Sequence, residues 1–151
     1  SDTAAALIAL NAEITLINSN GMTQKPIKGI YLPCGIKFHD LDNEIILTQI
    51  RVPFSPKKWW YKKLRMRKTL DFTSLTIAAT IDNQDIARIC LNGVSMTPIL
   101  IEEPIETLTL ESLIKQARKN CKTVDNDIMP LKYRREMINV YLEEFWNSLY
   151  I

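Results

Sequence analysis

The sequence predicts an α+β fold, with an antiparallel sheet of three or four strands followed by a C-terminal helical bundle. Stretches typical of strands follow one another through the middle of the chain, separated by turn-forming residues; they lie at 44–53, 59–68, 74–82 and 86–94. From Pro98 onward, apolar residues recur at helical spacing instead. Strands that are followed by helices, without alternation, are typical of the α+β class.

The N-terminal region predicts a short helix and a hairpin. Residues 3–12 form an apolar helical stretch, and 12–18 alternate as a strand does. The sequence Asn-Ser-Asn-Gly at 18–21 is a strong turn signal, so a second extended piece at 22–27 would complete a hairpin. Residues 28–43 are expected to form a connecting loop.

The C-terminal region predicts three helical segments. Residues 101–108 and 109–121 are both interpreted as helical, and Thr109 with Ser112 three residues later is a plausible N-terminal cap. A longer helix is expected at 131–150. The residues expected close to its apolar face are Tyr133, Met137, Val140, Tyr141, Glu144, Phe145 and Leu149.

Composition limits the class of protein. The chain has 151 residues, of which 46% are apolar and 24% charged, with a net charge of only +2; these values are ordinary for one globular domain or part of a larger one. No apolar run approaches the ~18 residues of a membrane-spanning helix. The N-terminus has no basic leader, so a signal peptide is not expected. It also lacks a starting Met, so we expect a chain that is trimmed, engineered or cut from something longer. The three widely spaced cysteines favour a reducing compartment.

Catalytic and metal-binding motifs are not evident in the sequence. The single histidine, His39, stands beside Asp40 in the predicted loop, where such a residue is usually on the surface. The cysteines have no ligand spacing, and the four glycines form no phosphate-binding loop. We therefore predict no catalytic residue and no metal ligands within this chain.

The basic stretch at 57–68 is the most unusual local feature. As a strand it would place Trp60, Lys62, Leu64, Met66 and Lys68 on one face, and Trp59, Tyr61, Lys63, Arg65 and Arg67 on the other. A helix layer could cover the first face. The second face suits an anionic or phosphate-bearing partner, or its charges simply discourage edge pairing.

The order of residues in 61–72 resembles a family signature, Tyr-x-Lys-x-x-x-Arg-Lys-x-x-Asp-Phe. The family is the flavoprotein subunit of molybdenum hydroxylases, which includes relatives of xanthine dehydrogenase, carbon monoxide dehydrogenase and 4-hydroxybenzoyl-CoA reductase. Four flanking stretches are similar to the family in the same order: 1–16, 44–53, 91–100 with its Gly-x-Ser-x-x-Pro turn, and 130–144 with its Tyr-Arg-Arg.

The resemblance implies a cytoplasmic, multi-subunit oxidoreductase. Residues 1–41 would be the remnant of the FAD-binding domain with a connecting loop, and 42–151 the C-terminal domain. The glycine-rich FAD segments of the family lie upstream of the position that matches Ser1. The implied partners are an N-terminal FAD-binding half, an iron–sulfur subunit with 2Fe–2S clusters and a molybdopterin subunit. The resemblance implies no association with a membrane. Electrons would pass from the molybdenum centre through the clusters to FAD and then to an acceptor such as NAD⁺.

Three positions match residues that contact FAD in the family: Asp2, Leu47 and Lys63. A carboxylate can accept hydrogen bonds from cofactor hydroxyls, and a lysine near a flavin can stabilise negative charge on its reduced ring. Arg67 and Asp71 also match, and their spacing suggests a structural ion pair. Departures from the family pattern include Arg65 and the basic, aromatic 57-KKWW-60. The alternative is a small module that binds nucleic acid or anionic surfaces through 57–68.

Overall fold

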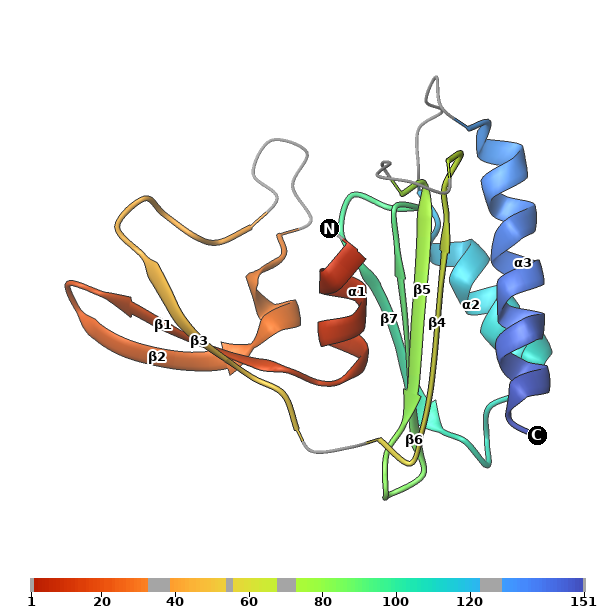
Figure 1. Cartoon of the computed structure of the whole chain (residues 1–151), viewed down its shortest axis with the longest axis horizontal. Coiled ribbons are helices and arrows are strands. Elements are labelled where there is room, and N and C mark those ends of the chain that lie inside the picture. Colours follow the sequence, from red (N-terminus) through yellow and green to blue (C-terminus); the bar gives the residue numbers. More distant parts are fainter. Residues whose placement is uncertain (1, 33–38, 54–55, 68–72, 123–128, 151) are drawn as a thin grey trace.

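The computed structural model describes residues 2–32, 39–53, 56–67, 73–122 and 129–150. These residues form two antiparallel sheets and three α-helices, which confirms the predicted α+β class (Figure 1). The larger sheet lies between helices, and the smaller sheet extends to one side of it.

The larger sheet has four strands in the order β4-β5-β6-β7. They span Lys58–Leu64, Leu75–Ile81, Ile86–Asn92 and Ile99–Pro104. All seven residues of β5, LTIAATI, are buried, as expected for a strand covered on both faces. The predicted turn between β5 and β6 is present, and Asp82 accepts hydrogen bonds there from the backbone N–H groups of Gln84 and Ile86.

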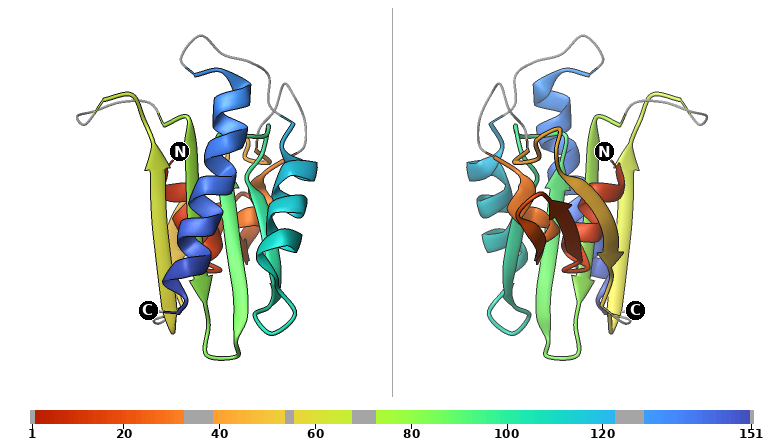
Figure 2. Two further views of the ribbon diagram at one scale, coloured as in Figure 1. Left: turned by 90° about the vertical axis from the view of Figure 1, so that its right-hand side faces the viewer. Right: turned by 90° about the vertical axis from the view of Figure 1, so that its left-hand side faces the viewer.

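Helices cover both faces of this sheet (Figure 2). Helices α2 (Leu110–Asn120) and α3 (Leu131–Ser148) cover one face. Helix α1 (Asp2–Ala9) lies against β5 and β6 on the other face. The sheet therefore separates two hydrophobic cores, one under α2 and α3 and one under α1.

The smaller sheet has the order β2-β1-β3, with β1 at Glu13–Asn18, β2 at Gly21–Pro26 and β3 at Ile46–Arg51. The β1–β2 hairpin confirms the predicted turn, in which Gly21 adopts a φ of 117°. A short 3₁₀ helix, Ile27–Ile30, follows the hairpin and contributes buried residues to the core under α1. We name this three-stranded unit the small sheet.

One helix prediction and one strand prediction are corrected by the sheet pairing. The stretch at 101–108 is not helical: β7 ends at Pro104, a turn follows, and β7 pairs Ile99 with Leu91 and Ile101 with Ile89 and buries both isoleucines. This alternation of apolar residues has the period of a strand. The predicted strand at 44–53 exists as β3 but joins β1 in the small sheet, not the larger one. The proposed domain boundary between residues 41 and 42 stays a prediction.

The two C-terminal helices confirm the remaining helix predictions. Helix α2 begins with the expected cap, a reciprocal pair of side-chain to backbone hydrogen bonds between Thr109 and Ser112. In α3 the predicted apolar face is partly wrong, because Tyr133 and Val140 are exposed. The buried residues of α3 are Arg134, Ile138, Tyr141, Leu142 and Phe145. No helix in the described part of the chain is long and apolar enough to cross a membrane.

Candidate cofactor-contact site

The basic strand β4 presents two faces, as its sequence predicts. Trp60 lies against the aromatic side chains of α3, with ring centroids 6.3 Å from Tyr141 and 6.1 Å from Phe145. Leu64 on the same face is buried. Met66 is exposed beyond the end of β4, which is at Leu64, so it was wrongly assigned to the covered face.

Each of the four lysines between 57 and 63 has a partner within the chain. Lys57 Nζ lies 2.7 Å from Asp85 Oδ1, and Lys62 is paired with Glu144 of α3. Lys58 donates a hydrogen bond to the carbonyl of Leu149 near the C-terminal end of α3, where a cation is electrostatically favourable. Because three of these four lysines are in ion pairs, the stretch offers less charge to an external polyanion than its composition suggests.

Lys63 is paired with Asp2, which lies 61 positions earlier in the sequence. Lys63 Nζ is 2.9 Å from Asp2 Oδ2, and the Thr73 hydroxyl donates to the same oxygen at 2.8 Å. The Thr76 hydroxyl lies 3.5 Å from Asp2 Oδ1. Two elements bring these groups together: α1 carries Asp2 in its first turn, and β5 pairs Thr76 directly opposite Lys63 of β4. We call Asp2, Lys63, Thr73 and Thr76 the Asp2 cluster.

The Asp2 cluster keeps its carboxylate ionised and accessible. Burial alone would raise the pKa of Asp2, but the hydrogen bonds from Lys63 and Thr73 and the charge of Lys63 lower it below 3.8. The side chains of Asp2 and Lys63 remain 36% and 31% exposed. Nearby, burial and the charge of Asp2 raise the pKa of Tyr61. The cluster can therefore both accept and donate hydrogen bonds to a polar ligand placed against it.

Leu47 lies elsewhere in the fold. It is on β3 of the small sheet, opposite Leu16 of β1, with 41% of its surface exposed. The structure thus unites two of the three residues that the resemblance selects and places the third on a different sheet. The role of all three in binding a cofactor stays a prediction, and the expected Arg67–Asp71 ion pair involves a residue outside the described part of the chain.

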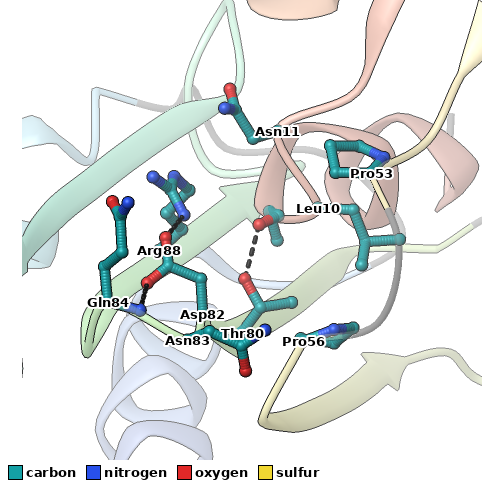
Figure 3. Close-up of a pocket in the computed structure, with 10 residues that line it drawn as sticks. Leu10, Asn11, Pro53, Pro56, Thr80, Asp82, Asn83, Gln84 and Arg88 are labelled. Atoms are coloured by element: carbon teal, nitrogen blue, oxygen red, sulfur yellow. Dashed lines mark hydrogen bonds and ion pairs between the residues drawn. The ribbon is translucent and has the colours of Figure 1, made fainter.

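A pocket of about 330 Å³ lies at the opposite end of α1 from Asp2 (Figure 3). Two pairs of its polar groups are hydrogen-bonded: Arg88 Nη1 donates to Asp82 Oδ2 at 2.7 Å, and the Thr80 hydroxyl donates to the carbonyl of Ala9. These bonds fix the β5–β6 turn and tie the end of α1 to the sheet. The pocket is therefore explained by structural contacts, and it does not coincide with the Asp2 cluster.

Other candidate reactive groups lack the surroundings of an active site. Cys90 is fully buried, and this burial raises the pKa of its thiol to about 12, far from the value of a reactive thiolate. His39 is exposed and forms an isolated backbone bridge with Tyr31. Among the described residues, no group of three or more His, Cys, Asp or Glu side chains could hold a metal ion.

Sequence reasoning did not identify Thr73 and Thr76 as members of the cluster. The spacing of Thr73 and Thr76 is unremarkable along the chain, and their relevance depends on the β4–β5 register and on how α1 docks against β5 and β6. No local sequence pattern predicts the β4–β5 register or the docking of α1. The only available signal was that both threonines follow the stretch that carries Lys63.

Comparison with solved structures shows a shared fold. The chain superposes on a chain of the Cu,Mo-containing CO dehydrogenase in its cyanide-inactivated form, with a TM-score of 0.74, 23% identity and 95% of this chain covered. It also matches CO dehydrogenase from Hydrogenophaga pseudoflava, with a TM-score of 0.75, 23% identity and 95% coverage. Quinoline 2-oxidoreductase from Pseudomonas putida 86 gives a TM-score of 0.68, 15% identity and 95% coverage.

The chain spans about half of each of these longer chains, namely 54%, 57% and 54% of their lengths. No family model matches the sequence, and no curated protein matches it significantly. At this level of identity the comparison defines a fold class, the one found in these oxidoreductase chains.

Proposed function

We propose that this chain is the C-terminal part of the FAD subunit of a molybdenum-hydroxylase-type oxidoreductase. The observation that carries the proposal is the ion pair between Asp2 and Lys63. The family resemblance selected both residues from distant parts of the sequence. Their ion pair is partly exposed, so both side chains can reach a ligand. The shared fold with oxidoreductase chains supports the same assignment.

The chemistry of the Asp2 cluster fits a flavin cofactor. FAD, when bound, accepts electrons and passes them to an acceptor. The ionised Asp2 carboxylate would accept hydrogen bonds from hydroxyl groups of the cofactor. The Lys63 ammonium would provide positive charge where a reduced ring becomes negative, and Asp2 holds that ammonium in place. In this role the chain performs no substrate chemistry and serves to hold and orient the cofactor.

The proposal includes the partners that such a subunit requires. These are an N-terminal FAD-binding half, an iron–sulfur subunit that delivers electrons and a molybdopterin subunit that oxidises the substrate. The assembly would be cytoplasmic. The half-length match to the solved chains supports the need for an N-terminal half.

Reconstitution with FAD tests the proposal. The chain is co-expressed with an upstream flavin-binding half, and bound FAD per complex and the flavin reduction potential are measured. Asp2→Asn and Lys63→Met should lower FAD retention by about tenfold each, which corresponds to one charge-assisted hydrogen bond of roughly 1.4 kcal/mol. Lys132→Met, which removes an exposed lysine of α3, is the matched control. Unchanged FAD content and potential in both cluster variants would show that the site is wrong.

A salt titration with DNA separates this proposal from the nucleic-acid alternative. Binding through several phosphate contacts weakens steeply as salt rises, because bound counterions are released. Since Lys57, Lys62 and Lys63 form ion pairs within the chain, we expect no measurable affinity for single- or double-stranded DNA near physiological salt. Tight, salt-sensitive binding that Lys58→Ala abolishes would instead favour the alternative.

A further inference from the structure

Strand β3 is unusual because neither of its faces is covered. All six of its residues, ILTQIR, are exposed, whereas all seven residues of β5 are buried. In the described structure β3 pairs only with β1, so its other edge carries backbone groups without strand partners. A strand that buries none of its side chains contributes little to stability, so its apolar content needs another explanation.

The exposed apolar residues of β3 continue onto its neighbours. On one face, Ile17 of β1 lies opposite both Met22 of β2 and Ile46 of β3, and Met22 and Ile46 are 67% and 65% exposed. Together with Leu47, Ile50 and Val52, which are also exposed, they form what we call the β3 patch.

The other face of the β3 patch extends the core under α1. Ile14 and Leu16 of β1 are buried in that core, and they lie opposite Ile50 and Leu47. A bulge at Thr15/Leu16 in the pairing allows Leu47 and Ile50, three positions apart, to share this face. The apolar face of the small sheet is therefore buried at β1 and exposed at β3. An exposed apolar surface that continues a buried core is typical of a surface that another polypeptide covers.

The other sheet edges carry the charges and prolines that commonly prevent strand addition. Edge strand β4 carries Lys58, Lys62 and Lys63, and β7 ends in Glu-Glu-Pro. Strand β2 ends in Lys-Pro. Strand β3 carries only one charged residue, Arg51 at its end, which forms an ion pair with Glu13 of β1. The β3 edge is thus the least protected of the four in the described structure.

We propose that the β3 patch is a docking surface to which a polypeptide adds a strand along the β3 edge, and that the occupant is the upstream half of the same flavoprotein. The choice of occupant rests on the function proposed above. It is argued from the solved chains, whose lengths are only about half covered by this chain, and from continuity between the patch and the core under α1. An added strand would supply the missing backbone partners, and its side chains would cover Ile46 on one face and Leu47 on the other.

Association measurements on surface variants test this surface. The chain is mixed with the separately expressed upstream half, and the affinity is measured by sedimentation. Ile46→Lys and Ile50→Lys, one on each face of β3, should each weaken association by at least tenfold, because a lysine replaces an apolar contact next to the added strand. The control is Val140→Lys, which alters an apolar residue on α3 about as exposed as Ile50 (41% against 43%) and should leave association unchanged. Circular dichroism verifies that each variant is folded.

The outcomes separate the surface from the proposed function. Equal association of all variants would overturn the β3 surface, even if the complex binds FAD. A complex that is sensitive to Ile46→Lys but holds no FAD would support the surface and overturn the flavin assignment. If the chain alone forms dimers that Ile46→Lys disrupts and Val140→Lys does not, a second copy is the occupant and the proposed occupant is wrong.

Discussion

Gly93 occupies a backbone position that other residues tolerate poorly. Its φ is 88°, and a Cβ atom there would lie 2.7 Å from the carbonyl oxygen of Ser74. Gly93→Ala should therefore lower the free energy of unfolding by roughly 1–3 kcal/mol, measured by chemical denaturation. Gly29→Ala is a matched control, because its Cβ would meet only the Lys25 side chain at 3.9 Å. Equal stability of the two variants would contradict this account of the turn.

Asp2 should make stability depend on pH in the acidic range. Its folded-state pKa lies below 3.8, so its contribution is present at neutral pH and is lost as the pH falls through the folded-state value. Asp2→Asn should cost about 0.5–1 kcal/mol at pH 7, a modest value because the ion pair is partly exposed.

The difference between wild type and Asp2→Asn should shrink towards zero below about pH 4, the ordinary range of a free aspartate. Denaturation curves recorded from pH 2.5 to 7 measure this difference in the free energy of unfolding. Glu143→Gln, on the exposed side of α3, should change stability much less at neutral pH. A difference that stays constant over the whole range would show that the carboxylate charge is not what stabilises the cluster.

Helix α3 is held to the larger sheet by a buried arginine. Arg134 is 2% exposed, and its Nη1 donates a hydrogen bond to the carbonyl of Gly93 at 3.0 Å. Arg134→Met should destabilise the protein by roughly 1.5–3 kcal/mol, because the Gly93 carbonyl loses its charged donor. Arg135→Met, on the exposed side of the same helix, should be nearly neutral in thermal melts. A similar loss in both variants would point to a general effect of removing charge from α3.

Element boundaries followed from the sequence where local signals were strong. The Asn-Ser-Asn-Gly turn, the Thr109 cap and strands β5 and β6 were all predicted. The choice of partner strand was not predicted, because the pairing of β3 with β1 joins residues far apart in the sequence, from Ile17 with Ile46 to Glu13 with Arg51. The stretch at 101–108 was interpreted as helical, but pairing with β6 determined the structure of β7.

The buried face of α3 and the Asp2 cluster show two further limits of prediction from the sequence. An apolar pattern predicts a burial stripe, but it cannot anticipate that an arginine will be buried to satisfy a carbonyl on another element. For the cluster, the resemblance selected Asp2 and Lys63, and their proximity required the docking of α1 on the sheet. The threonines that complete it became visible only in three dimensions.

The molecule as a whole is organised around one sheet with a core on each face. Because β5 and β6 contribute side chains to both cores, these cores should unfold together. The small sheet is attached through β1, which lies partly in the core under α1, whereas β3 lies outside both cores. The free energy of local opening should therefore decrease from β5 towards β3.

Hydrogen exchange should reveal this gradient. Amides of β5 should exchange only through global unfolding, whereas β3 amides should exchange through local opening, roughly 100-fold faster or more. If the β3 patch receives a strand from the upstream half, protection of β3 should rise in the complex while that of β5 changes little. Ile46→Lys should prevent this rise and Val140→Lys should not. Full protection of β3 in the isolated chain would mean that its open edge is already occupied, and the docking surface would have to be sought elsewhere.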